Sequence, residues 1–394
     1  MSEFLLNEVC ELIVDCPHTT ANDEGKGFPL VRTPNIGKGR LVYDGMHRVC
    51  EDVYNKRNAR AVPQENDLIF AREATAGNVA LIQKGEKVCL GQRTVLIRPN
   101  QEKVNPAFLT YFLLAPKQQY NLLSTANGAT VAHVNLPTIR NLKIDLPELS
   151  TQHRIATILS RYDSLIENYQ KQIKLLEEAA QRLYKEWFVD LHFPGHENTK
   201  IVDGVPEGWR KGSLGDIAYE SGKKISKDSR DYYDCYLPID CLPKHSLTYL
   251  KPADIKMAES SLVSFEENDI IFGAMRPYFH KVCFAQSKGL TRTTCFVLNS
   301  KEKEYREYLL MLLFEDSTVK HATSISVGTT MPYTRWKEFK SMEVVLPSRV
   351  VVVSFGKNIS YITSLLKNYS SQIRLLTEAR DRMLPKLMNG EIKV

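Results

Sequence analysis

The amino-acid sequence contains an internal repeat in which part of the first half recurs 200 residues later. The stretch Ser164–Arg182 matches Ser364–Arg382 at 11 of 19 positions. The match extends back without a gap to Leu146-Pro147 and its counterpart Leu346-Pro347, and it fades farther upstream. A repeat of this length predicts two copies of one structural unit. The fading similarity predicts that the copies differ most in their N-terminal parts.

The well-matched stretches both have the hydrophobic pattern of a long helix. Apolar residues recur at alternating spacings of four and three, which places them on one stripe that can face a partner helix. About 36 helical residues would form a rod of roughly 54 Å. The alternative is that both are ordinary core helices of one domain. Arg380 stands where the first copy has Ala180, so the stripes are not equivalent throughout. The predicted seam is Tyr162, Ile166, Tyr169, Ile173, Leu176 and Leu183 with Ile362, Leu366, Tyr369, Ile373, Leu376 and Met383.

The parts of the chain that precede the helices have a different pattern, and we call them the first and second heads. Short β-rich runs, such as Val79–Ile82, Thr94–Ile97 and Cys295–Leu298, alternate with turn residues. Helices are predicted at Pro106–Ala115 and Glu304–Phe314. Each head is therefore expected to be a mixed α+β globule. The predicted division is a first head at 1–148, a first helix at 149–192, a linker and second head at 193–347, and a second helix and tail at 348–394.

Sequence motifs for catalysis are missing. There is no G-x-x-x-x-G-K-[S/T] loop, no G-x-S-x-G elbow and no H-E-x-x-H helix. Asn105-Pro106-Ala107-Phe108 is one residue short of an amino-methyltransferase motif and is better explained as the start of a helix. The eight cysteines include no C-x-x-C pair, which favours reduced thiols over a zinc site. We therefore expect a binding or targeting protein without catalysis or metal.

The N-terminal stretch Met1–Cys16 has no Lys or Arg, and no apolar run is long enough to span a bilayer. A cytoplasmic location is therefore expected. The net charge is only +6 in 394 residues, which is compatible with a polyanionic partner but does not demand one.

Several segments resemble conserved motifs of the specificity subunits of type I restriction–modification systems. Gln152-His153-Arg154-Ile155-Ala156 and Ala180–Phe188 resemble the beginning and end of that family's first conserved helix, and Arg382–Ile392 is similar to its closing motif. The resemblance covers nearly the whole chain and is looser in the heads. The similar head segments are Arg72–Ala80, Gly91–Val95 and Met275–Val282.

The resemblance implies an α+β fold of two mixed α/β target recognition domains, separated by an antiparallel two-helix coiled coil in a pseudo-twofold duplication. Each domain would read one half of a split double-stranded DNA target. Catalysis would belong to two methyltransferase subunits, which modify adenine, and to restriction subunits, which translocate and cleave DNA. S-adenosylmethionine, ATP and magnesium are accordingly expected on those partners and no cofactor on this chain. Two alternatives are the specificity subunit of a related methyltransferase–nuclease system and a coiled-coil scaffold without DNA specificity.

Residue types that read base edges or hold phosphates gather in a few segments of each head. The best is Arg32–Arg40, with three cations, an Asn and two glycines. Solvated surface charge is the alternative for every candidate, because basic and acidic residues nearly balance: 17 against 16 in residues 1–150 and 21 against 21 in 191–348. The candidates are Arg32, Thr33, Asn35, Lys38, Arg40, Arg72, Asn78, Gln92, Arg93, Thr130 and His133, and then Lys223, Lys224, Arg276, Tyr278, His280, Lys281, Arg292, Thr330 and Tyr333.

The end of the first helix carries two adjacent aromatic residues, Trp187 and Phe188. We predict that they are exposed and that they dock a methyltransferase subunit.

Overall fold

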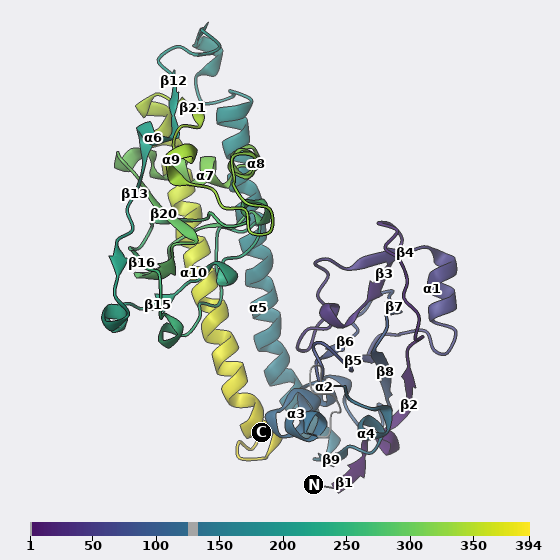
Figure 1. Ribbon diagram of the computed structural model, residues 1–394. Coiled ribbons are helices and arrows are strands. Elements are labelled where there is room, and N and C mark those ends of the chain that lie inside the picture. Colours follow the sequence, from purple (N-terminus) through teal and green to yellow (C-terminus); the bar gives the residue numbers. More distant parts are fainter. Residues whose placement is uncertain (1, 125–132) are drawn as a thin grey trace. The chain divides into compact units, whose positions relative to one another are not determined.

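The computed structural model describes residues 2–124 and 133–394, which divide into two compact units (Figure 1). Unit 1 consists of residues up to 164 together with 377–394, and unit 2 consists of residues 165–376. Each of the two long helices, α5 (Leu149–Tyr184) and α10 (Arg349–Met388), contributes to both units. The helices begin at the predicted positions, within one residue.

Unit 1 is built on a four-stranded antiparallel sheet of strand order β2-β8-β5-β6. A second sheet has the order β4-β3-β7 and includes one parallel pair, β3 with β7, and β1 pairs with β9. The strands are β1 (Ser2–Leu5), β2 (Cys10–Asp15), β3 (Phe28–Val31), β4 (His47–Val49), β5 (Leu68–Ala71), β6 (Val79–Leu81), β7 (Cys89–Leu90), β8 (Thr94–Pro99) and β9 (Lys143–Leu146). The shorter helices are α1 (Glu51–Arg57), α2 (Pro106–Leu114), α3 (Pro116–Leu123) and α4 (Leu136–Arg140).

Unit 2 repeats this plan although its sequence has diverged. Its antiparallel sheet has the order β13-β20-β17-β18, its second sheet β14-β16-β19-β15 again includes one parallel pair, and β12 pairs with β21. The strands are β10 (Ile201–Val202), β11 (Val205–Pro206), β12 (Arg210–Ser213), β13 (Ala218–Glu220), β14 (Lys224–Ile225), β15 (Cys235–Tyr236), β16 (Leu262–Phe265), β17 (Ile270–Gly273), β18 (Val282–Phe284), β19 (Gly289–Arg292), β20 (Cys295–Ser300) and β21 (Glu343–Leu346). The helices are α6 (Leu214–Ile217), α7 (Arg306–Phe314), α8 (Asp316–Ser324) and α9 (Trp336–Phe339).

The helix that follows the central sheet of the first head begins at a proline, as predicted. Asn105 caps α2, because its side-chain oxygen accepts a hydrogen bond from Phe108 N at 2.9 Å, and Pro106 occupies the first turn. Proline suits this position because the first-turn N–H groups have no partner within the helix. The Asn-Pro pair is thus a structural start signal.

The two long helices pack against each other with opposite chain directions. In unit 2 the rings of Tyr169 and Tyr369 lie 5.1 Å apart, and those of Tyr184 and Phe355 lie 6.2 Å apart. A later residue of α5 therefore contacts an earlier residue of α10. In unit 1 the Tyr162 hydroxyl donates to Met383 Sδ at 3.3 Å in the same antiparallel sense. The predicted antiparallel helix pair is therefore confirmed. Seam residues that are buried are Ile166, Ile173, Leu366 and Ile373, and those half-buried against the same core are Tyr169, Leu176, Leu183, Ile362, Tyr369 and Leu376.

The aromatic pair at the end of the first helix lies in the core of unit 2. Trp187 and Phe188 are each only 7% exposed, on a π-helical turn at Lys185–Val189. The ring of Phe188 lies 4.8 Å from those of both Tyr308 and Phe355. The prediction of an exposed docking end was therefore wrong. The pair fills the space between α7 and α10, which come from parts of the sequence more than a hundred residues away.

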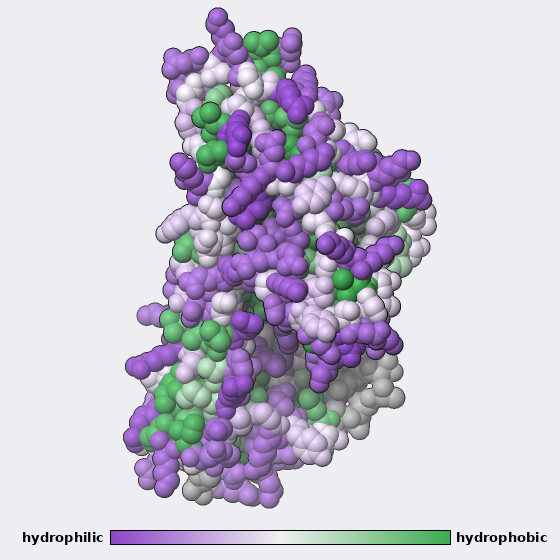
Figure 2. Space-filling model, turned by 90° about the vertical axis from the view of Figure 1, so that its left-hand side faces the viewer, coloured by the Kyte–Doolittle hydropathy of each residue, from purple (hydrophilic) through white to green (hydrophobic). Residues whose placement is uncertain are grey.

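Figure 2 shows one face of the molecule, on which hydrophilic residues dominate and hydrophobic residues form separate patches. None of the helices in the described part of the chain has the length and apolar character needed to cross a membrane.

Candidate nucleic-acid interface

Three chain segments meet at one place in the first head, which we call the first junction. The Val134 N–H donates to the carbonyl of Arg72 at 3.0 Å, and the Arg72 N–H donates to the carbonyl of Arg93 at 2.9 Å. Arg72 directly follows β5, Arg93 directly precedes β8, and Val134 lies just before α4. Because connections at strand ends face solvent and vary freely, such a place suits ligand recognition.

The second head has an equivalent arrangement, which we call the second junction. The Thr334 N–H donates to the Ala274 carbonyl at 2.9 Å, and the Ala274 N–H donates to the Thr294 carbonyl at 3.0 Å. Ala274 directly follows β17, Thr294 directly precedes β20, and Thr334 lies just before α9. The repeat is thus preserved at the level of individual backbone hydrogen bonds.

A dense polar network orients the side chains of the first junction. Arg72 donates from Nε to Val134 O at 2.9 Å, from Nη1 to Asp15 Oδ2 at 2.7 Å and from Nη2 to His133 Nε2 at 2.9 Å. Since His133 Nε2 accepts, its Nδ1 carries the proton and donates to Glu73 at 2.6 Å. Arg72 is 7% exposed and fully engaged. Its predicted role as a base reader is therefore wrong, and it positions His133 instead.

Arg93, Gln92 and His133 remain at the accessible side of this junction. The side chain of Arg93 is 59% exposed and pairs with Glu73 at 2.8 Å. Gln92 donates to His18 O at 2.9 Å. Thr130, which we also predicted here, lies outside the described residues.

The cation-rich loop of the first head is held against β6 by its backbone. The Gly37 N–H donates to Arg40 O at 2.9 Å, which closes a tight turn with Lys38 exposed at its tip. Gly39 has φ of +97° and donates its N–H to Val79 O at 2.7 Å. A residue with a Cβ would be strained there, so glycine lets the loop lie flat on the strand. The loop presents Lys38 and the half-buried Arg40.

Other polar residues of this region point inward. Asn35 is 1% exposed and donates to Val42 O at 3.1 Å, and Thr33 is 8% exposed. The half-buried Asn78 donates to Ile36 O at 2.9 Å. Asn35 and Asn78 thus satisfy loop backbone groups. Because Thr33 and Asn35 are buried, the prediction that they face DNA was wrong. Arg32 is half-buried and donates to Gly45 O at 2.9 Å.

The second junction presents two arginines and a tyrosine. Arg276 has φ of +50° and donates from Nη2 to Thr330 O at 3.1 Å. The Tyr333 hydroxyl donates to Thr293 O at 3.1 Å, and Arg292 Nη2 donates to Ser260 Oγ at 3.3 Å. The Nε atoms of Arg276 and Arg292 are buried and have no hydrogen-bond partner among the described residues. Both side chains are half-buried, and Thr330 is exposed beside Arg276.

Comparisons with known proteins identify the family. The family model described as "Type I restriction modification DNA specificity domain" matches twice, over residues 1–178 and 206–374. The chain belongs to this family. Each match covers one head and most of the long helix that follows it, which is the repeat seen in the sequence and in the fold.

Curated relatives of the specificity family align along most of the chain. The MjaIX specificity subunit of Methanocaldococcus jannaschii is 24% identical over 94% of this chain and 88% of its own length. The EcoDI specificity subunit of Escherichia coli is 22% identical over 85% of this chain and 81% of its own length. The crystal structure of the S subunit from M. genitalium superposes with a TM-score of 0.61 at 16% identity, covering 98% of this chain and 95% of that one. The predicted fold class is thereby confirmed.

The remaining candidates of the second specificity domain differ in exposure. Tyr278 is 49% exposed, and Lys223 and Lys224 are exposed near the start of β14. Lys281 is half-buried and donates to Ile239 O at 2.6 Å. His280 is 3% exposed and hydrogen-bonded to Phe314 O, so its predicted contact with DNA is wrong.

Sequence reasoning missed a buried acid that binds the second head to α5. Glu177 of α5 is 8% exposed, and its Oε1 accepts hydrogen bonds from Ser246 Oγ, Leu247 N and Thr248 Oγ1, each at 2.8 Å. Burial raises the pKa of the Glu177 carboxyl. This residue ties α5 to the second head within unit 2. Its position directly after the seam residue Leu176 was the available signal, because a carboxylate bordering a buried stripe needs partners.

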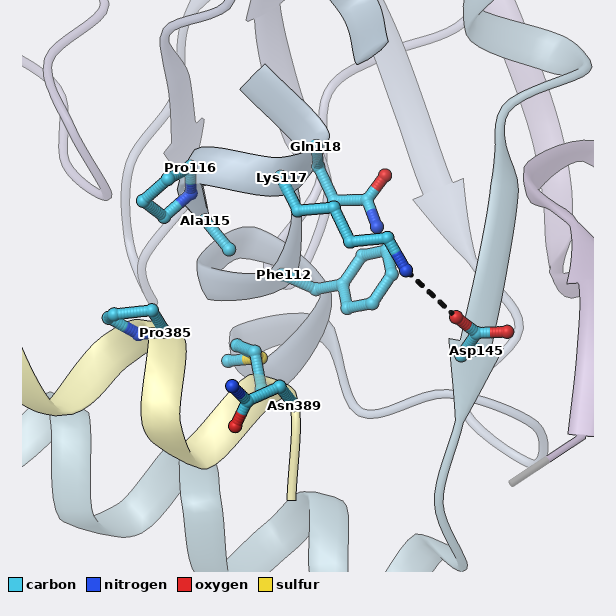
Figure 3. Close-up of a pocket in the computed structure, with 9 residues that line it drawn as sticks. Phe112, Ala115, Pro116, Lys117, Gln118, Asp145, Pro385 and Asn389 are labelled. Atoms are coloured by element: carbon cyan, nitrogen blue, oxygen red, sulfur yellow. Dashed lines mark ion pairs between the residues drawn. The ribbon is translucent and has the colours of Figure 1, made fainter. Parts of the chain in front are cut away.

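A cavity of about 280 Å³ in unit 1 is lined by residues of α2, α3, β9 and the end of α10 (Figure 3). Pro385 of α10 and Asn389, directly after that helix, lie on one side and Phe112 on another. The charged lining residues, Lys117 and Asp145, pair with each other at 3.5 Å.

The cysteines are all unpaired thiols, and burial raises the pKa of the Cys89 and Cys295 thiols to about 11.

Proposed function

We propose that the chain is the sequence-reading subunit of a type I restriction–modification enzyme and that each head reads one half of a bipartite DNA target. The double match of the DNA specificity domain carries this proposal, because two reading domains in one chain imply two half-sites. The first junction offers Arg93 and His133, whereas the second offers Arg276 and Tyr333. Because these side chains differ, the half-sites should differ in sequence.

Direct reading would use the donors that the junctions leave available. Arginine forks pair with guanine in the major groove, and hydroxyl groups and lysines hold phosphates. Arg93, Arg276 and Arg292 would serve the bases, and Lys38 and Thr330 would serve the backbone. Since acids and bases nearly balance in each head, affinity would depend on this arrangement and on partner subunits rather than on net charge.

The paired helices would act as the spacer between the two reading domains. With 36 and 40 residues, α5 and α10 correspond to about 54 Å and 60 Å of helix. Two readers on one face of B-DNA sit about one helical turn apart, roughly 34 Å. Stiff helices of this length could fix such a separation, whereas a flexible linker could not.

The chemistry would belong to the partner subunits. Two methyltransferase subunits would dock on the two copies of the repeated helix and carry S-adenosylmethionine, and restriction subunits would use ATP and magnesium. This chain would select the site and bring the catalytic subunits to it, without a catalytic residue of its own.

Mapping methylated adenines in DNA is the direct test. The full chain is produced together with the methyltransferase subunits of its own system, and methylated sites are sequenced. We expect a two-part motif with a fixed gap. Arg93→Ala should relax only one half of the motif and Arg276→Ala only the other, while Lys84→Ala, an exposed lysine between β6 and β7, should change neither. A scaffold without DNA specificity would yield no motif.

A further inference from the structure

Three potential metal ligands meet in the second head, outside the second junction. His245 lies in a loop before β16, His280 follows the short helical turn Pro277–Phe279, and Asp316 is the first residue of α8. The ligand atoms of the three side chains lie within 4.8 Å of one another. The imidazole rings of His245 and His280 are 4.2 Å apart, and His280 Nδ1 lies 3.1 Å from Asp316 Oδ1.

The hydrogen bonds of His280 leave its Nδ1 facing the Asp316 carboxylate. His280 Nε2 lies 2.9 Å from the carbonyl of Phe314, and a carbonyl only accepts, so Nε2 carries a proton. In a neutral ring, Nδ1 then presents a lone pair to the Asp316 carboxylate, which is also an acceptor. A metal ion at Nδ1 would turn this repulsion into shared coordination.

Two further features are those of a metal-binding histidine. A ligating imidazole usually donates its other N–H to a carbonyl or carboxylate, which fixes the ring, and His280 does so to Phe314. His245 and His280 have φ of +49° and +50°, and the His245 N–H donates to the His280 carbonyl at 2.9 Å. Non-glycine residues in this region are strained, and such strain concentrates at ligand clamps.

We propose that His245, His280 and Asp316 bind one divalent transition-metal ion of the zinc type. Two imidazoles and one carboxylate form a donor set that Zn²⁺ accepts, and water can take a fourth position. Asp316 and His245 line a cavity of about 490 Å³ from which an ion and water can enter. The ion would join three segments of the second head that are far apart in sequence.

The site would stiffen two functional parts of unit 2. The turn that ends at His280 begins next to Arg276 of the second junction. The loop that begins at His245 continues into Ser246, Leu247 and Thr248, which bind Glu177 of α5. The ion would thus help to hold Arg276 in place and to fasten the second head to the long helix.

Zinc binding by the full chain tests the proposal without any DNA assay. The chain is treated with a chelator, dialysed against Zn²⁺ and assayed for bound metal and for its melting temperature. We expect one Zn²⁺ per chain and a higher melting temperature that the chelator reverses. Asp316→Asn, at an exposed side chain, and His245→Asn, which tolerates the left-handed backbone, should each weaken binding about ten-fold or more. His321→Ala, on α8 outside the cluster, should bind as the parent does. Absence of stoichiometric zinc in the parent, or equal binding by Asp316→Asn and His321→Ala, would overturn the proposal.

Discussion

The guanidinium group of Arg380 lies 2.7 Å from the carboxylate of Asp163, and this ion pair breaks the symmetry of the repeat. Both side chains are largely buried, at 17% and 6% exposed, and the Tyr111 hydroxyl donates to the other Asp163 oxygen at 2.5 Å. The equivalent positions of the other copy are Thr363 and Ala180. Two α5 segments paired with each other would leave Asp163 opposite Ala180 without a cation. The pair therefore favours α5 with α10, much as single polar residues set partner choice in coiled coils.

Removing one member of this pair should destabilise unit 1 strongly. We expect Asp163→Asn or Arg380→Ala to lower the free energy of unfolding by about 3 kcal/mol, because a buried charge loses its partner. The double variant Asp163→Thr with Arg380→Ala carries the residues found at the equivalent positions of the other copy, Thr363 and Ala180. Chemical denaturation should show a smaller loss of unfolding free energy for the double variant than for either single variant. Additive losses in the double variant would contradict a coupled pair.

The buried carboxyl of Glu177 predicts a specific pH dependence. Its pKa is raised in the folded protein by burial, so the folded state holds a proton more tightly than the unfolded state. The resulting stabilisation is present at pH below the unfolded pKa and is lost as the pH rises through the folded pKa. We expect the melting temperature of the parent, relative to Glu177→Gln, to fall as the pH rises from about 4 upward. Glu178→Gln, at a more exposed neighbour, is the control and should show no such trend. If the difference in melting temperature between the parent and Glu177→Gln does not change with pH, the pKa of Glu177 is not raised in the folded protein.

The burial of Trp187 predicts a defect of stability rather than of docking. Truncation of a large core aromatic typically costs about 3–5 kcal/mol, and the Trp187 ring packs 5.7 Å from that of Phe355. Trp187→Ala should therefore lower the melting temperature markedly, and Trp187→Phe should lower it less. Gel filtration with the methyltransferase subunits, below the melting temperature, should still show the complex. Lost assembly by a fully stable Trp187→Ala chain would restore the docking role.

The sequence predicted the long helices well because their apolar stripe is repeated and local. The spacing of the stripe depends on helix geometry alone, and the observed burial of Ile166 and of its counterpart Leu366 follows from it. The individual strands of the first head, such as β6 and β8, were also found to within a few residues. In these elements the local pattern and the tertiary packing agree.

The candidate site was predicted only in part, for physical reasons. The sequence marked Arg72 and His133 as polar residues in suitable turns, but it did not show that Asp15 and Glu73 accept hydrogen bonds from them. Asn35 looks like a base reader in sequence because a polar side chain that binds its own loop is the same residue type as one that faces DNA. Burial depends on partners far along the chain.

The proposed metal cluster could not have been predicted at all. His245, His280 and Asp316 are separated by about 35 residues each, which matches no ligand motif used in the sequence analysis. The expectation of a metal-free chain rested on the cysteine spacing and on the missing H-E-x-x-H motif. Only the fold brings the three together.

Shortening both helices by one heptad tests the spacer role most directly. Deletion of residues 166–172 and 366–372 is centred on the contacting rings of Tyr169 and Tyr369 and preserves the register of the seam. The loss of about 10.5 Å of helix corresponds to about three base pairs. Leu175→Ala with Leu375→Ala, at two exposed positions, leaves the length unchanged and is the control. With the methyltransferase subunits present, sequencing of methylated sites should show the same two half-sites with a gap shorter by about three base pairs. An unchanged gap with undiminished methylation would contradict the account.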